Sequence, residues 1–410
     1  MKEHKDIDYP LLISILALVA FWCIMISSVS VYDSNRLSMK LIQLWIDPPK
    51  YPNARFVFRS LIQAAIGCIV MVFAIKIPYL WWKKQVKVMS ALSIVLLILV
   101  LVLGVKINGA RWWFDIPGIP FSLQPTEFLK ISLIISVAAF CSRYKNMLAS
   151  TTEGFIPFLG IVGVPAFLVL LQPDLWALMI IIPIVTSIYF VAGWNVRIIA
   201  IIGFFAFIGA SMLYTIGHYN SPEDKNQFSY IYDRMNTFFQ SSKTAIEENT
   251  MHHQNKQALI AIGSGGFLWL WFGHSVQKYG YLPEPQGDFI FSVITEELWF
   301  LWALVIIGIY MYIIYRWFMI ASFCEEMFGK LTAFGITMWI FWQMVINTSV
   351  NLSIFPNTGL TLPFVSYGGS SLLMMLLAWG ILLAISREVD LSKKKFRNIL
   401  YLYLSKKPRR

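Results

Sequence analysis

Asp288 is the residue whose position in the sequence most clearly suggests chemistry. It follows segment 281–287 and directly precedes a long apolar run that begins at Phe289. A carboxylate at the start of an apolar helix has restricted hydration, which raises its pKa and suits a general base or a metal ligand. Capping of that helix is the alternative role for this aspartate. Glu296 and Glu297 lie two turns deeper, and at least one of them is expected to face the protein interior.

Three other ionisable residues accompany apolar runs. Glu127 and Lys130 are three positions apart at the start of one run, a spacing that lets them pair on one helix face. This pattern fits a buried ion pair that fixes the helix and equally a role in substrate binding. Asp174 follows Gln172-Pro173 between two apolar runs, where it either caps the next helix or belongs to a polar site.

A segment rich in glycine, proline and hydroxyl residues, 356–371, separates two further apolar runs. Such a composition lets backbone amides and hydroxyls line a cavity at membrane depth, although a re-entrant packing loop is the alternative. The candidate binding residues in this segment are Pro363, Ser366, Tyr367, Gly368, Gly369 and Ser370. Another candidate segment, Arg111-Trp112-Trp113-Phe114, fits an interfacial aromatic belt equally well.

Composition places these residues in a membrane protein. The chain has 410 residues, of which 58% are apolar and only 13% are charged, whereas soluble domains carry roughly a quarter of charged residues. The net charge of +11 is better explained by cytoplasmic loops than by nucleic-acid binding. We therefore expect an all-α, polytopic fold whose ten membrane helices lie near 10–31, 57–77, 88–105, 123–141, 156–171, 175–193, 198–217, 289–315, 331–351 and 369–386.

The distribution of basic residues predicts the orientation. With both termini inside, 20 Lys and Arg residues fall on the inner side and 12 on the outer side, which favours cytoplasmic termini. The long loop 218–288 then faces outward and is expected to form short helices at the membrane surface. The tail 387–410 carries nine Lys and Arg against two acids, which suits an anchor on anionic lipids. We expect residues 1–410 to form a single membrane domain.

Six segments, taken in order, resemble the SEDS family, the FtsW and RodA group of peptidoglycan glycosyltransferases. In the segment near Asp288 this chain has Pro285-Gln286-Gly287 where the family has Ala-His-Thr, and its 275–278 run, Ser-Val-Gln-Lys, is more usual in the FtsW branch. The six segments are Asn108-Gly109-Ala110-Arg111-Trp112-Trp113, Gln124-Pro125-Thr126-Glu127-Phe128, Gln172-Pro173-Asp174, 257–266, Tyr281-Leu282-Pro283-Glu284 with Asp288-Phe289-Ile290-Phe291, and 362–371.

The resemblance implies ten helices, lipid II as substrate and polymerisation of glycan strands on the outer face of the bacterial cytoplasmic membrane. It also implies a class B penicillin-binding transpeptidase as partner, together with divisome or elongasome proteins, and gives no reason to expect nucleic acid. Asp288 aligns with the family's essential catalytic aspartate, and Trp113 aligns with a tryptophan needed for activity. Two alternatives from other classes are a transporter that flips lipid II without bond chemistry and a scaffold for the transpeptidase.

The reaction that the resemblance implies needs one base and a stabilised leaving group, because a single displacement inverts the anomeric carbon. Asp288 is the expected base, and no second flanking carboxylate of the hydrolase kind is required. Candidates for neutralising the departing pyrophosphate are Arg111, Arg234 and Lys278, or a divalent cation such as Mg²⁺ or Mn²⁺. Glu127 and Lys130 are expected to shape the cavity floor, and Asp174 and Glu284 complete the expected binding residues.

Six tryptophans stand at positions where the family has glycine. Small residues let helices approach each other closely, so the largest side chain should clash there. Our hypothesis is that the source lineage reads UGA as glycine, whereas the alternative is genuine tryptophans that face lipid. TGG codons in the gene would refute the hypothesis. The positions are Trp22, Trp176, Trp269, Trp271, Trp299 and Trp302.

Overall fold

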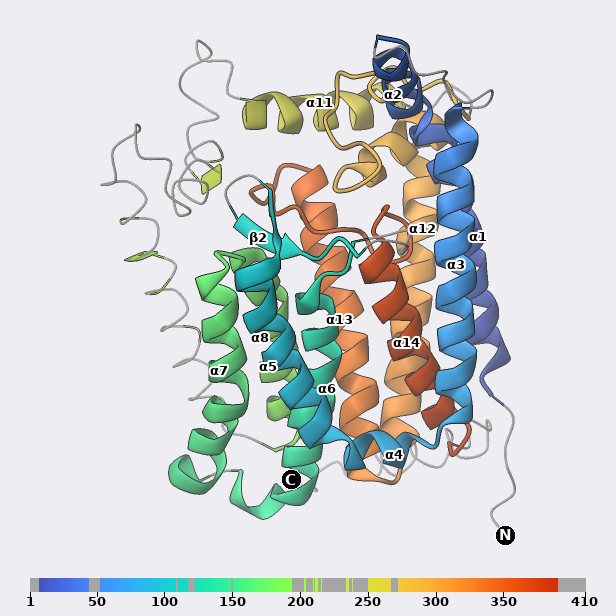
Figure 1. The fold of residues 1–410 in the computed structure, drawn as a ribbon. Coiled ribbons are helices and arrows are strands. Elements are labelled where there is room, and N and C mark those ends of the chain that lie inside the picture. Colours follow the sequence, from blue (N-terminus) through green and yellow to red (C-terminus); the bar gives the residue numbers. More distant parts are fainter. Residues whose placement is uncertain are drawn as a thin grey trace, which may run out of the picture.

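The computed structural model describes most of the chain as a bundle of long apolar helices (Figure 1). The described residues are 7–43, 52–107, 110–116, 122–148, 150–193, 250–266 and 272–389, with single positions between 203 and 238 that include Arg234. The long helices are α1 (Tyr9–Val29), α3 (Pro52–Lys76), α5 (Val86–Leu103), α6 (Pro125–Arg143), α7 (Ile156–Leu171), α8 (Leu175–Val191), α12 (Ile290–Phe323), α13 (Met327–Asn351) and α14 (Gly369–Ser386).

The helices confirm the predicted class. Within the described ranges, eight helical segments are long and apolar enough to cross a membrane, and α8 is apolar but shorter. They occupy nine of the ten predicted spans, and the remaining one, 198–217, lies almost entirely outside the described residues. The chain is therefore a multi-pass membrane protein, while the number ten and the side on which the termini lie stay predictions.

Short elements mark the two ends of the bundle (Figure 1). At one end lie α2 (Val31–Gln43), α11 (Thr250–Ser264) and the antiparallel pair β1 (Val105–Ile107) and β2 (Ala110–Trp113). At the other end, α4 (Tyr79–Lys84) links α3 to α5, near a 3-10 turn (Lys145–Met147) and a π turn (Thr151–Phe155). Helix α11 lies across the bundle end, as predicted for the long loop.

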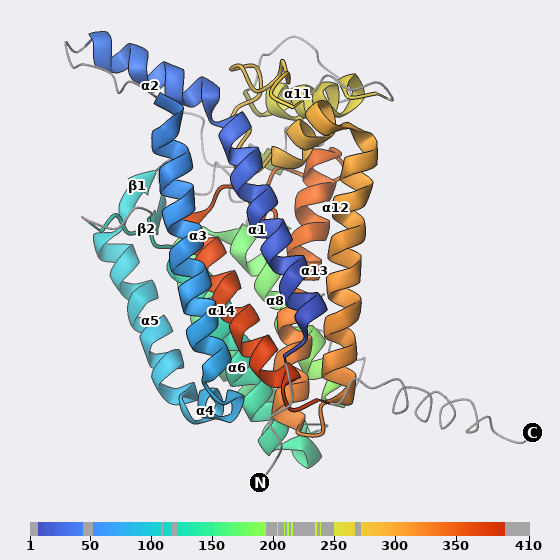
Figure 2. The ribbon, with the colours of Figure 1, turned by 90° about the vertical axis from the view of Figure 1, so that its right-hand side faces the viewer.

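The interior of the bundle is formed by α6, α13 and α14, whereas α5 and α7 lie at its edge. Helix α14 packs side by side with α3 (Figure 2). Glycines permit this approach, because a Cβ on Gly380 would lie 2.4 Å from the Ala74 Cβ and one on Gly67 would lie 2.4 Å from Leu376. Small residues at helix crossings are the usual means of close packing in membranes.

Buried ion pairs connect α12 to its neighbours. Lys278 pairs with Glu297 at 2.7 Å, and the Ser28 hydroxyl on α1 donates to the same carboxylate at 2.8 Å. The neighbouring Glu296 accepts hydrogen bonds from the Ser275 hydroxyl and the Val276 amide. Both glutamates are 1% exposed, which confirms and extends the expectation that one of them faces inward. A charge in lipid is tolerated only with such partners.

The structure gives Trp299 a backbone conformation that glycine adopts readily and tryptophan does not. Its φ of 86° and ψ of 160° interrupt α12, and this region of φ and ψ is essentially restricted to glycine. Trp22 and Trp176 are buried rather than turned to lipid, Trp302 is exposed, and Trp269 and Trp271 lie outside the described residues. The Trp299 conformation supports the glycine hypothesis at that position, and the codon usage itself stays a prediction.

Two substitutions at each of two tryptophans test this conformation. At Trp299, glycine is expected to be more stable than alanine by about 1–3 kcal/mol, because both remove the ring and only glycine avoids the strain. At Trp302, which is helical, alanine is expected to be more stable than glycine by about 1 kcal/mol. Thermal unfolding of the four variants in detergent measures both differences. The same order of stability at the two positions would show that Trp299 is not held in a glycine conformation.

Candidate active site

Asp288 lies just before α12, which begins at the end of the bundle where α11 and β2 are found (Figure 1). Its side chain is half-buried. The N-cap residue of α12 is Phe289, and no side chain caps the helix. Helix capping, the alternative considered from the sequence, is therefore wrong for this aspartate. The carboxylate is left to face its surroundings rather than the helix terminus.

Two asparagines on α13 hold the backbone of Asp288. Asn347 donates from Nδ2 to the Asp288 carbonyl at 3.0 Å and to the Leu360 carbonyl at 2.7 Å. Asn351 donates to the same Asp288 carbonyl at 2.9 Å and accepts from the Ser292 amide at 3.1 Å. This amide clamp, as we call the pair Asn347 and Asn351, joins the start of α12 to the 356–361 segment.

Arg234 comes from the long predicted loop and approaches Asp288 at Gly359. A Cβ on Gly359 would lie 3.6 Å from both the Arg234 Nη1 and the Asp288 Oδ2 atoms. Gly359 also has a φ of 71°, a value that side chains disfavour. The guanidinium donates to the Asn357 carbonyl at 2.7 Å. The guanidinium of Arg234 and the carboxylate of Asp288 therefore both border Gly359.

The surroundings of Asp288 favour its protonated form. The pKa of Asp288 is raised to about 7, first by burial and second by the Glu284 carboxylate, while the Arg234 guanidinium lowers it. Glu284 turns back toward Asp288, since its Oε2 atom lies 3.5 Å from the Cβ position of Gly287. A carboxyl group that titrates near neutral pH is suited to general base catalysis.

A second polar group lies close enough to interact electrostatically with Arg234. Glu127 and Lys130 form a buried ion pair at 2.8 Å, and Asp174 Oδ1 caps α8 by accepting from the Ala177 amide at 3.0 Å. Burial raises the pKa of Asp174 to about 6, opposed chiefly by this amide and then by Lys130. Both predicted structural roles, the ion pair and the cap, are thus confirmed.

Glu127 and Asp174 each have one buried carboxylate oxygen without a described hydrogen-bond donor. The two atoms are Glu127 Oε2 and Asp174 Oδ2. A buried acceptor without a donor costs free energy, and such groups are commonly explained by an unseen water or ligand. The structure thus brings Glu127, Lys130, Asp174, Arg234 and Asp288 into one polar group, with Glu284 at its edge.

The 356–371 segment packs against the segment that carries Asp288. The Tyr367 amide donates to the Gln286 carbonyl at 2.7 Å, and the Ser366 hydroxyl accepts from the Leu362 amide at 2.7 Å. The Pro363 carbonyl accepts from the Tyr310 hydroxyl, and Ser370 bonds the carbonyl of Ser122. Gly368 and Gly369 begin α14. These contacts support a packed re-entrant segment beside the site.

Three other predicted site residues make no described contact with Asp288. Lys278 contacts Glu297, Ser28 and the Gly273 carbonyl, so its charge is already balanced within the bundle. Arg111 is exposed and donates to the carbonyls of Leu101 and Val102 at the end of α5. Trp113 is half-buried on β2.

The amide clamp was missed from the sequence, although a signal was present. Gln343, Asn347 and Asn351 are spaced four residues apart within an apolar run, so they share one helix face. Gln343 donates to the Thr361 carbonyl at 2.9 Å, which extends the clamp along the 356–371 segment. Polar side chains repeated at this spacing inside a membrane span indicate a functional interior.

A protein-built metal site is not found near these acids. Among the described residues, no three His, Cys, Asp or Glu side chains come together as metal ligands. Mg²⁺ is often held by one or two carboxylates together with substrate phosphates, so the predicted divalent cation stays a prediction. The residues present provide no preformed cage for it.

Removal of one asparagine tests the clamp. Asn347→Ala removes the side-chain donor to the Leu360 carbonyl and one of the two side-chain donors to the Asp288 carbonyl. The free energy of unfolding should therefore fall by about 1–3 kcal/mol. Denaturant unfolding in detergent measures it. Thr348→Ala is the matched control, because the Thr348 side chain makes no hydrogen bond in the described structure. Equal losses in the two variants would contradict the clamp.

Comparison with known proteins gives the family. The model of the FtsW/RodA/SpoVE family of cell cycle proteins matches residues 9–391. Stage V sporulation protein E of Bacillus subtilis is 33% identical over 375 residues, which cover 91% of this chain and 96% of that protein. The probable peptidoglycan glycosyltransferase FtsW of Trichlorobacter lovleyi is 33% identical over 389 residues, 94% of this chain and 95% of that protein.

A solved structure shows the same fold. This is a structure of a peptidoglycan synthase complex, which concerns the structural coordination of polymerization and crosslinking. One of its chains matches with a TM-score of 0.71 and 22% identity, and the match covers 94% of this chain and 99% of that chain. The match of the family model over most of the length and the shared fold confirm the resemblance predicted from the sequence. This chain belongs to the FtsW/RodA/SpoVE family.

Proposed function

We propose that this chain is a peptidoglycan glycosyltransferase that polymerises lipid II into glycan strands by an inverting displacement. The proposal rests chiefly on the surroundings of Asp288. Its carboxyl group is half-buried, its pKa is raised to about 7, and the guanidinium of Arg234 lies nearby at Gly359. Relatives named peptidoglycan glycosyltransferase FtsW, 33% identical over nearly the whole length, support the reaction class.

In the proposed step, Asp288 removes the proton from the 4-hydroxyl group of the acceptor sugar. The hydroxyl oxygen then attacks the anomeric carbon of the donor sugar, and a glycosidic bond forms there. The bond from that carbon to undecaprenyl pyrophosphate breaks, and the pyrophosphate leaves with the electron pair. A base of pKa near the working pH balances availability of the ionised form against strength as a proton acceptor.

Arg234 is the cation best placed to stabilise the leaving pyrophosphate. Burial lowers the pKa of Arg234 to about 10, so the guanidinium stays charged at neutral pH. A positive group held where negative charge develops lowers the barrier because little reorganisation is needed. Lys278 and Arg111, the other two predicted cations, bind other groups: Lys278 pairs with Glu297, and Arg111 donates to the Val102 carbonyl.

The remaining polar group offers binding for sugar hydroxyls. Glu127 Oε2 and Asp174 Oδ2 are buried acceptors without a described donor, and donors on a sugar would satisfy them. A divalent cation that arrives with the pyrophosphate would add charge neutralisation, and no step of this proposal depends on it. Trp113 and the residues 363–370 remain proposed binding residues on the strength of the family resemblance.

The setting of the reaction is part of the proposal. The excess of basic residues on one side favours the cytoplasmic membrane with Asp288 facing outward. A class B penicillin-binding transpeptidase is the proposed partner, supported by the fold match to a chain of a peptidoglycan synthase complex. Names among the relatives, FtsW and stage V sporulation protein E, favour division-type machinery over elongation.

A transporter of lipid II is the competing function, with a scaffold for the transpeptidase as the third. Transporter sites typically lie near the middle of the bilayer, at discontinuous helices. Asp288 instead comes just before α12, and α12 begins at an end of the bundle (Figure 1). This placement favours chemistry on a substrate held at the membrane surface.

Removal of the proposed base is the direct test. Asp288→Asn is expected to lower polymerisation by roughly 10²–10⁴-fold, the usual contribution of a general base, while the protein stays folded in the membrane. Incubation of the purified chain and its partner with lipid II, followed by glycan-strand analysis, measures the rate. Asp115→Asn, an exposed acid at the same end, should retain activity. Full activity of Asp288→Asn would remove this residue from the chemistry.

The pH dependence of the rate gives a second test. The ionised fraction of Asp288 rises as the pH passes through about 7, so the rate should fall as the pH drops below that value. Glu284→Gln removes the like charge that raises this pKa, so the acidic limb should move to lower pH. Glu153→Gln, at the far end of the bundle, is the control. A limb that stays in place or moves upward in Glu284→Gln would contradict the assignment.

A further inference from the structure

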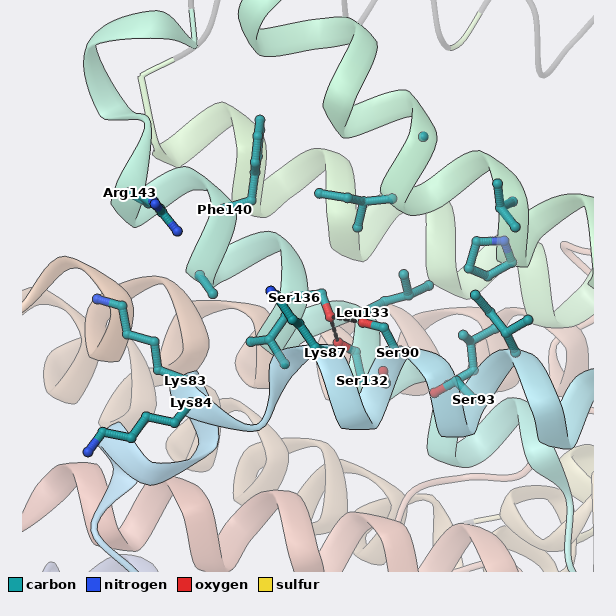
Figure 3. A pocket seen from close by; sticks show the side chains of 18 of the residues that line it. Lys83, Lys84, Lys87, Ser90, Ser93, Ser132, Leu133, Ser136, Phe140 and Arg143 are labelled. Carbon is teal, nitrogen blue, oxygen red and sulfur yellow. Dashed lines mark hydrogen bonds between the residues drawn. The ribbon is translucent and has the colours of Figure 1, made fainter.

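A cavity of about 580 Å³ lies between α5, α6 and α7, at the α4 end of the bundle and therefore opposite Asp288 (Figures 1 and 3). Its volume falls within the range of small-molecule sites in proteins. No residue of the proposed active site lines it. The cavity is thus a separate feature of the fold.

The lining changes in character along the helices (Figure 3). Cationic side chains form one end, where Lys84, Lys87 and Arg143 lie. One turn further along α5 and two turns back along α6 come hydroxyls, with Ser90 and Ser136 paired at 2.9 Å. Beyond them the walls are mainly apolar, at Ile94, Leu129 and Val164 among others, with Ser93 as one further hydroxyl. This sequence of charge, hydroxyl and hydrocarbon matches the phosphate, ester and acyl parts of a glycerophospholipid.

The cationic end carries charge that no described carboxylate neutralises. Lys83 is paired with Glu326 at 3.0 Å. Among the described residues, by contrast, no carboxylate lies within ion-pair distance of Lys84, Lys87 or Arg143. Basic pockets between membrane helices on the cytoplasmic side favour anionic headgroups.

The helices that wall the cavity also expose apolar side chains beside it. Its walls on α5 and α7 adjoin residues that expose apolar side chains, such as Leu92, Ile98 and Leu159. At Gly160, which lines the cavity, nothing lies within 4 Å of a Cβ position. An acyl chain that lies against Gly160 would therefore displace no protein atom at this point.

We propose that this cavity binds an anionic glycerophospholipid, with its phosphate at Lys84, Lys87 and Arg143 and one acyl chain between α5 and α7. The chain's own basic tail carries the wrong charge for the site. A zwitterionic lipid would leave the positive charge unbalanced. The bound lipid would fill the space between α7 and the α5–α6 pair and hold α7 to the bundle.

Titration of the purified full chain with dioleoylphosphatidylglycerol, followed by native mass spectrometry, tests the proposal. Lys84→Gln combined with Lys87→Gln is expected to weaken binding on the order of 30-fold, at the usual contribution of each lysine to anionic lipid binding. Lys76→Gln combined with Lys145→Gln removes the same charge from exposed positions at the same end that do not line the cavity, and should bind as the wild type does. Equal weakening by the two pairs would overturn the proposal.

Gly160 separates a lipid in the cavity from one that adsorbs by charge alone. Gly160→Leu fills the space and should abolish binding, whereas Gly160→Ala adds one methyl group where there is room and should retain it. If the double lysine variant loses lipid binding but Gly160→Leu retains it, the lipid lies on the surface and the proposal is overturned. So would tighter binding of dioleoylphosphatidylcholine, or displacement of phosphatidylglycerol by equimolar undecaprenyl phosphate, which would assign the cavity to a polyprenyl lipid.

Discussion

The backbone carbonyl of Asp288 accepts hydrogen bonds from two amide side chains, and this contact fixes where three distant segments meet. Asn347 and Asn351 belong to α13, Asp288 precedes α12, and the same Asn347 amide group reaches Leu360. A buried backbone polar group must find its hydrogen-bond partner within the protein. The amide clamp meets this requirement for non-helical backbone and, in doing so, sets the position of the carboxylate relative to Arg234 and Gly359.

Electrostatic balance explains why a charged group is retained here. Burial and Glu284 disfavour the ionised form of Asp288, while Arg234 favours it, so the group titrates near neutral pH. Two other charge pairs are close: Lys278 with Glu297 connects the segment before α12 to α12 and, through Ser28, to α1, whereas Lys130 with Glu127 lies within α6 and belongs to the polar group. Charged residues that all lie beside or within apolar runs of the sequence thus fall into two kinds. Some form close ion pairs, whereas the charge of Asp288 is only partly balanced by Arg234. Perturbed acids of the second kind are typical of catalytic positions.

The sequence predicts the membrane helices well because about 20 apolar residues must occur together to cross a bilayer. Asp288 was identified for a similar reason, since a lone carboxylate beside such a run is conspicuous. Lys278 and Arg111 were assigned to the site because their loops were expected to face the same side, but loop folding sends each to other partners. The asparagines of α13 escaped notice because neutral amides interrupt an apolar run only weakly. Trp299 shows the opposite case, in which a sequence anomaly anticipates a backbone conformation.

The account rests on Asp288 meeting an acceptor hydroxyl group at the end of the bundle. A structure of the Asp288→Asn variant with its transpeptidase partner and lipid II bound at donor and acceptor positions tests this most directly. The account predicts the acceptor 4-hydroxyl oxygen within about 2.6–3.2 Å of the residue-288 side chain, with the donor pyrophosphate beside Arg234. An acceptor sugar bound out of reach of residue 288, with another acid or a metal-bound group at its hydroxyl, would contradict it.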